Sequence, residues 1–116
     1  MIIGVAGPYS ADSEEKRKSN FEALNIAAAK LLEMGHTPLI GINAALHVVE
    51  KSNVKDTYEA LMRISMAVID GCEGLLMIGE SPGANKERDL ILSKNLPVYY
   101  SLDEITVKKI HDREKF

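Results

Sequence analysis

The segment SPGANKERDL, residues 81–90, places one acidic side chain where it could do chemistry. Ser81 followed by Pro82 is typical of a helix start, with an N-cap and a proline in the first turn. On such a helix Glu87 shares a stripe with Gly83 and Ile91, among small and apolar residues. A carboxylate near a helix N-terminus stays ionised, because the dipole and the free N–H groups favour its charge. It could act as a nucleophile, although on spacing alone a partly solvated acid that complements the dipole explains Glu87 slightly better.

The start of the same helix offers a second candidate site. Ser81 and the free N–H groups of the first turn would bind an anion, with a purely capping role for Ser81 as the alternative. Other signatures are absent: there is no G-x-x-x-x-G-K-[ST], no G-x-G-x-x-G after the first apolar run, and no pair of Cys or His at metal spacing. We therefore expect no metal and no cofactor.

The elements that position these residues alternate between two hydrophobic periods. Short apolar runs predict strands at 1–7, 37–42, 73–79 and 97–101. Amphipathic spacing and capping signals predict helices at 13–36, 56–70, 81–94 and 101–111. The piece between them, residues 43–56, is predicted as short helix or irregular structure. This order predicts a three-layer α/β domain, Rossmann-like or flavodoxin-like, with a parallel sheet of four to five strands.

Glycine and polar residues follow three of these strands. The segments are GPYS at 7–10, GINA at 41–44 and GESPGAN at 79–85. Ligands of such sheets bind beyond the carboxyl ends of the strands, at the point where the strand order reverses. Each segment alone is the usual way to turn a chain, but their coincidence at one edge predicts a single crevice.

Composition limits the classes of protein that fit. A chain of 116 residues, 46% of them hydrophobic, suits one domain over 1–116 with a real core. The formal net charge of −3 does not indicate a surface that binds nucleic acid. No apolar stretch approaches the roughly 20 residues that cross a bilayer, so no membrane partner is expected. The single cysteine, Cys72, and the lack of a signal-peptide pattern favour the cytoplasm.

The order of these motifs resembles the nucleoside 2-deoxyribosyltransferase superfamily. The similarity lies in GPYS near the start, Asn20 early in the first helix, MGHTP before the second strand and GESPGANKE after the third. It spans residues 2–101 and extends to the 2′-deoxynucleoside 5′-phosphate N-hydrolases and a small uncharacterised bacterial branch. The S-x-G-x-x-x-E pattern from Ser81 to Glu87 is its most specific part.

The resemblance assigns roles by position. Glu87 falls on the family nucleophile, which adds to C1′ of a deoxyribosyl group and forms a covalent glycosyl-enzyme. Ser81 falls on a position that contacts phosphate in the hydrolases and carries an acid in the transferases. The expected substrate is a nucleoside or its 5′-monophosphate. Its expected contacts are Gly7, Tyr9, Ser10, Asn20, Asn43, Ser81, Gly83 and Asn85.

One position departs from the family pattern. The relatives carry an aspartate eight residues ahead of an acid that here is Glu73, and this count lands on Ser65. General acid assistance typically contributes about 10² to 10⁴-fold to a rate, so its loss makes a nucleotide-binding sensor without catalysis a credible alternative. Asp70 or Glu80 could substitute, although a solvated loop acid is the simpler interpretation of Glu80.

Two further expectations concern the class of enzyme and its assembly. A riboside-monophosphate phosphoribohydrolase would usually show P-G-G-x-G-T-x-x-E, whose doubled glycine and threonine SPGANKE lacks. The relatives close their pockets with a neighbouring subunit, which implies at least a homodimer. The stripe of Met62, Met66 and Ile69 is a candidate contact, with a place in the core as the alternative.

Overall fold

Four short strands pair in parallel in the order β2-β1-β3-β4. The computed structural model describes residues 1–107. The strands are β1 (Ile2–Ala6), β2 (Thr37–Leu39), β3 (Gly74–Met77) and β4 (Val98–Tyr99). Their order matches the first four strands of the flavodoxin-like sheet, in which the order reverses between β1 and β3. The predicted three-layer, Rossmann-like or flavodoxin-like α/β fold is confirmed.

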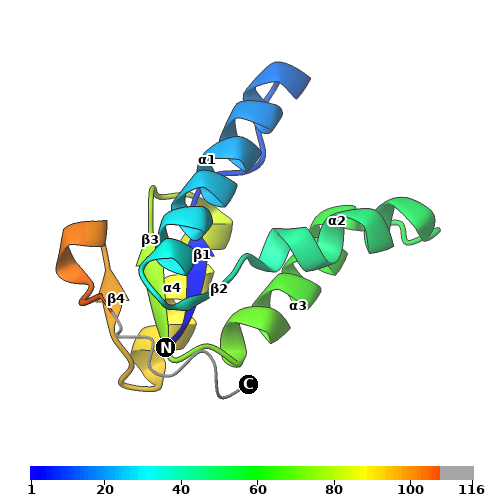
Figure 1. The fold of residues 1–116 in the computed structure, drawn as a ribbon. Helices are drawn as coiled ribbons and strands as arrows, with labels where there is room; N and C mark the ends of the chain where they lie inside the picture. Colours follow the sequence, from blue (N-terminus) through cyan, green and yellow to red (C-terminus); the bar gives the residue numbers. More distant parts are fainter. Residues whose placement is uncertain (108–116) are drawn as a thin grey trace, which may run out of the picture.

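Helices cover both faces of this sheet (Figure 1). They are α1 (Glu14–Glu33), α2 (Gly41–Lys51), α3 (Thr57–Asp70) and α4 (Pro82–Ser93), followed by the 3-10 turn η1 (Leu102–Glu104). One core cluster joins Ile3, Val5 and Leu76 to α1, and a second joins Leu75 and Met77 to α3 and α4. Successive residues of β1 and β3 thus serve opposite faces, as the pleat of a strand requires.

The helix starts follow from local capping chemistry. Ser13, Asp56 and Ser81 each accept the N–H of the residue three positions later, which satisfies a donor that has no partner inside the helix. Gly35, at a φ of 91°, lies in the left-handed region just beyond α1, where glycine carries no steric penalty. These boundaries confirm the helices expected from 13, 56 and 81.

Two predicted elements differ from the structure. The second strand was expected over 37–42, yet it ends at Leu39, and Gly41 begins α2. The helix expected over 101–111 is only the turn η1 within the described residues, because Ile105 leaves it in an extended conformation and packs into the first core cluster. Residues 108–111 of that helix lie outside the described part of the chain.

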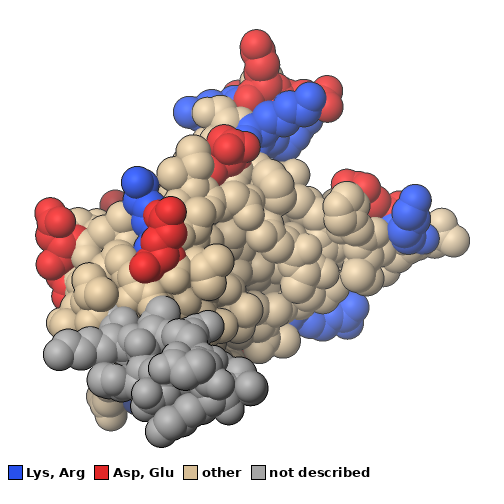
Figure 2. All heavy atoms as spheres, in the orientation of Figure 1, with Lys and Arg blue, Asp and Glu red and all other residues tan. Residues whose placement is uncertain are grey.

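On the face shown in Figure 2, charged side chains lie at the outer end of α1, at the tip of the α2–α3 pair and on the side near β4. The surface between α1 and the α2–α3 pair is mostly uncharged. None of the helices in residues 1–107 has both the length and the apolar character that crossing a membrane requires.

Candidate active site

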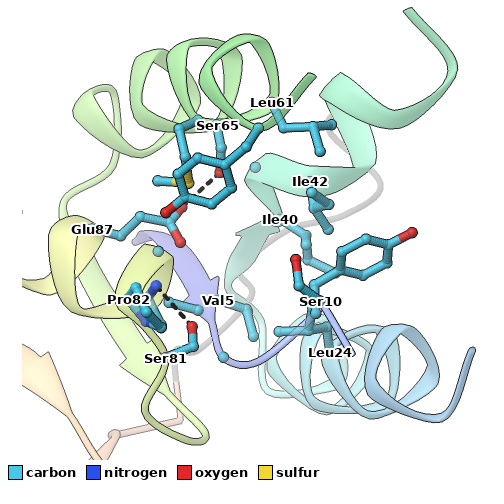
Figure 3. A pocket seen from close by; sticks show the side chains of 18 residues that line it. Val5, Ser10, Leu24, Ile40, Ile42, Leu61, Ser65, Ser81, Pro82 and Glu87 are labelled. Carbon is cyan, nitrogen blue, oxygen red and sulfur yellow. Dashed lines mark hydrogen bonds between the residues drawn. The ribbon is translucent and has the colours of Figure 1, made fainter. Parts of the chain in front are cut away.

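A cavity of about 360 Å³ lies at the carboxyl ends of β1, β2 and β3. Its walls come from the loop after β1, the start of α2, the inner side of α3 and the first two turns of α4 (Figure 3). Most of the lining is apolar, and among the described residues Glu87 is the one acidic or basic side chain, apart from the two tyrosines, that lines it. A concave apolar site with a few polar groups, in this size range, is typical of small-molecule binding. The crevice expected at the strand ends is therefore present.

Glu87 projects into this cavity from the second turn of α4. Its side chain is buried, with 7% of the residue exposed, and Ile91 one turn later lies in the second core cluster. The Ser65 hydroxyl on α3 donates a hydrogen bond of 2.8 Å to Oε2 of Glu87. This bond is visible in Figure 3 as a dashed line between the two helices. The inward orientation expected from the stripe with Gly83 is confirmed, and the alternative of a partly solvated acid is wrong.

The charge state of Glu87 differs from the expectation. Burial raises the pKa of this carboxyl to about 7, and the hydrogen bond from Ser65 opposes the rise. The helix dipole does not hold the pKa down, because Glu87 lies beyond the first turn, where the free N–H groups are found. Near neutral pH the carboxyl is therefore divided between its protonated and ionised forms, a range suited to acid–base or nucleophilic chemistry.

The Ser81–Gly83 segment lines the cavity next to Glu87. Ser81 Oγ accepts the N–H of Ala84 at 3.1 Å, which confirms the capping role. Pro82 has no N–H, so the anion site expected here is smaller than a free helix start would offer. The Ser81 hydroxyl proton and the Gly83 N–H form no hydrogen bond with any residue of the described part, and both are available to a ligand.

The loop after β1 supplies Gly7, Tyr9 and Ser10 to the lining. Asn20 does not line the cavity, but its Nδ2 donates to the Tyr9 carbonyl at 3.1 Å and so holds the loop against α1. The Tyr9 ring meets Phe21 edge to face, with centroids 6.4 Å apart. Asn20 thus holds this loop in place, and the structure does not bring its side chain to the cavity.

Two other expected contacts lie outside the cavity. Asn43 is exposed on α2, where its Nδ2 donates to Asn25 Oδ1 at 3.0 Å. Asn85 accepts from Arg88 Nη1 at 3.3 Å on the outer side of α4. The structure does not bring either residue to the cavity. Asn43 lies on the exposed side of α2, which begins at Gly41, and Asn85 is two residues from both Gly83 and Glu87, which at about 100° per residue places it on the opposite face of α4.

The acids considered as substitutes for the family aspartate are also elsewhere. Asp70 pairs with Lys94 Nζ at 2.9 Å, and Glu80 lies 3.6 Å from Arg88 Nη1 with 78% of its side chain exposed. Neither lines the cavity. Ser65, the residue that replaces the aspartate, does line it and contacts Glu87.

Sequence reasoning missed most of the wall formed by α2 and α3. This wall consists of Ile40, Gly41, Ile42, Tyr58, Leu61 and Met62. The available signal was Ser65, a polar residue on the same helical face as Leu61, Met62 and Ile69. Within residues 1–107 no group of three or more His, Cys, Asp or Glu side chains is placed to hold a metal ion.

Comparison with protein families identifies a match over most of the chain. A family described as a domain of unknown function (DUF4406) matches residues 1–100, which include the whole cavity lining. No curated protein matches the chain.

Proposed function

The chain belongs to the DUF4406 family, whose description states no activity, and we propose from its cavity that it cleaves or transfers the N-glycosidic bond of a deoxynucleoside or its 5′-monophosphate. The observation that carries the proposal is Glu87, a buried carboxyl with one hydrogen bond that faces an apolar cavity. Burying a charged group is unfavourable unless it is paired. No Lys or Arg of residues 1–107 lines the cavity to pair with this carboxyl, and a role in a reaction accounts for keeping it there.

The reaction proceeds in two displacements at C1′. First, an oxygen of ionised Glu87 bonds to C1′ while the C1′–N bond breaks, and the bonding electrons leave with the base, which takes up a proton from solvent water. Then water or a second base bonds to C1′, the bond from C1′ to Glu87 breaks, and the attacking group loses its proton. A cavity that excludes water stabilises the oxocarbenium-like transition states through the nearby carboxylate.

The resemblance to the nucleoside 2-deoxyribosyltransferase superfamily supports this assignment. Ser81, Gly83 and Glu87, the defined positions of S-x-G-x-x-x-E, all line the same cavity. Tyr9, which the resemblance places beside the sugar, lies in the same lining.

A second candidate function is supported by Ser65. A serine replaces the family aspartate, and neither Asp70 nor Glu80 reaches the cavity. Among residues 1–107, the leaving base therefore has no carboxylic acid other than Glu87 to protonate it. A nucleotide-binding sensor that retained the pocket without turnover fits this arrangement. If the protein is an enzyme, its turnover should be slower than that of a relative with the aspartate, by about the 10² to 10⁴-fold that general acid assistance contributes.

The test is incubation with nucleosides and 5′-monophosphates of each base, with free base followed by chromatography. Release of free base, or of a new nucleoside when a second base is added, supports the enzyme. Saturable binding without release supports the sensor. If neither binding nor release is found across the series, the nucleoside assignment is wrong.

A prediction about phosphate follows from Ser81. If its hydroxyl and the Gly83 N–H hold a 5′-phosphate, a monophosphate should outcompete the matching nucleoside by about 10 to 150-fold, because a charge-assisted hydrogen bond contributes roughly 1.5 to 3 kcal/mol. Ser81→Asp should reverse the preference, and it preserves the N-cap because aspartate caps a helix as well as serine. Competition binding measures both proteins, and equal affinities in the unmodified protein would remove Ser81 from this role.

We also propose a homodimer or larger assembly, on the resemblance alone. The contact stripe expected for it needs correction, because Ile69 is fully buried in the second core cluster and Met62 lines the cavity. For Ile69 the alternative of a place in the core is the correct one, whereas Met62 belongs to neither core cluster. Light scattering at micromolar concentration gives the assembly directly.

A further inference from the structure

α2 and α3 are in close contact where Gly41 meets Ser65. A Cβ at Gly41 would lie 2.8 Å from Ser65 Cα and would overlap the Ser65 hydroxyl. No side chain therefore fits at residue 41, and the space beside the first turn of α2 is filled by Ser65 itself. Gly41, Ser65 and Glu87 form a continuous line from α2 through α3 to α4.

The hydrogen bond from the Ser65 hydroxyl links α3 to α4 at a site that is shielded from water. Ser65 is 5% exposed and Glu87 is 7% exposed. The 2.8 Å bond from Oγ to Oε2 is the one hydrogen bond that the Glu87 carboxyl accepts within residues 1–107. A hydrogen bond to an ionised acceptor is stronger than a neutral one, and it fixes the rotamer of a side chain that has three rotatable bonds. Oε1, the other oxygen, is left unbonded (Figure 3).

We propose that Ser65 is the positioning residue of the site: it holds Oε2 of Glu87 so that Oε1 faces the cavity as the attacking atom, and Gly41 provides the space that this requires. This inference rests on the proposed function insofar as Glu87 is the nucleophile. The contact between the two side chains is independent of it. Ser65 therefore takes a role different from that of the aspartate it replaces, because a hydroxyl can donate to the nucleophile without adding a second negative charge.

Among the described groups around Glu87, the Ser65 hydroxyl is the one that favours the ionised form of the carboxyl. Tyr58 of α3 and Tyr9 of the loop after β1 line the cavity, and the Cys72 thiol lies between α3 and β3. The pKa of Cys72 is raised by burial and by the charge of Glu87, so this thiol is neutral at pH 7. No Lys or Arg of the described residues lines the cavity. Ser65→Ala should therefore raise the pKa of Glu87, since burial then acts without the opposing hydrogen bond.

The competing explanation is that Ser65 is only a small residue at a tight helix crossing. Alanine at 65 is as small and favours a helix more than serine, so this explanation predicts no change beyond a small gain in stability. The control is Ser93→Ala, on the same helix as Glu87. There the exposed hydroxyl donates to the Leu90 carbonyl and is outside the cavity.

The experiment measures two quantities in wild type, Ser65→Ala and Ser93→Ala. The first is the Glu87 pKa in the unliganded protein, from the pH titration of ¹³C-labelled carboxyl groups, with the Glu87 signal identified by its loss in Glu87→Gln. The second is the pH profile of kcat/KM on the best substrate. Ser65→Ala should move the titration and the acidic limb of the profile upward together, by about one to two pH units. At pH 6 this corresponds to roughly a tenfold or larger loss of kcat/KM, and Ser93→Ala should match wild type.

An unchanged Glu87 titration in Ser65→Ala overturns the proposal, even if the protein is an active enzyme. If no substrate is turned over, the function proposed above fails while the titration still decides whether Ser65 controls Glu87. Ser65→Cys, which retains a weaker donor of similar size, should give an intermediate shift and guards against an unexpected folding defect in the alanine variant.

Discussion

Glu87→Gln should reduce turnover by about 10³-fold or more while leaving ligand binding within a few-fold of wild type. Glutamine matches the shape of the side chain, and its carbonyl oxygen can still accept the bond from Ser65. It lacks the negative charge that attacks C1′ and supports the transition state. The measurement is free-base release at saturating substrate, together with a binding constant from calorimetry.

The matched control for this variant is Glu80→Gln. Glu80 lies seven residues earlier on the loop before α4, and its side chain is 78% exposed. The same chemical change there should leave turnover within about twofold of wild type, since surface substitutions away from special features have small effects. Equal turnover in Glu87→Gln and wild type would show that the carboxyl is not the nucleophile.

A covalent adduct gives an independent measurement of the same role. A 2-fluoro-substituted deoxyriboside has an electron-poor sugar that slows hydrolysis of the glycosyl-enzyme, so one pentosyl mass should accumulate on the protein. Peptide mapping should place it on Glu87. An adduct at another residue would contradict the two-displacement reaction as drawn.

The second large effect is a pH-dependent difference in stability between wild type and Glu87→Gln. The pKa of Glu87 rises from its ordinary value of 4.5 to about 7 in the folded state. The folded protein therefore binds more protons than the unfolded chain between these values, and stability falls as pH rises. At 1.36 kcal/mol per pH unit, wild type should lose about 3 kcal/mol relative to Glu87→Gln between pH 4.5 and 7. Below pH 4.5 the carboxyl is protonated in both states, and the contribution is fully retained.

Urea unfolding of both proteins from pH 4 to 8 measures this difference. Subtracting the two curves removes the titration of the other acids, which the proteins share. The difference should grow across pH 4.5 to 7 and then stay constant. Parallel stability curves would mean that Glu87 is more hydrated than its 7% exposure indicates.

The parts of the fold that could be predicted from sequence are those set by neighbours along the chain. The caps at Ser13, Asp56 and Ser81 depend on a side chain and an N–H three residues apart, so a short motif contains the information. The inward face of Glu87 depends on the period of one helix. The parallel sheet and the crevice at its carboxyl edge followed from the alternation of strands and helices along the chain.

The parts that could not be predicted depend on contacts between distant segments. The first residue of α2, Gly41, packs closely against Ser65, 24 positions away along the chain, and no pattern near residue 41 indicates this contact. The protonation of Glu87 depends on how deeply α3 and α4 enclose it, which no local pattern reports. The sequence identified Ser65 as the residue that replaces the family aspartate. Its hydrogen bond to Glu87 could not be predicted, because the bond depends on how α3 and α4 pack against each other.

Ser81 caps α4 and Glu87 lies on its second turn, so one rigid helix holds both residues in the wall of the cavity. Six residues advance about 9 Å along a helix axis, and the glutamate side chain leans back towards the N-terminus and shortens that span. The separation between the helix start and the attacking oxygen is therefore set by covalent geometry, and it is insensitive to movement of α2, α3 or the loop after β1. A ligand that contacts both the start of α4 and Glu87 must therefore match this fixed separation in length.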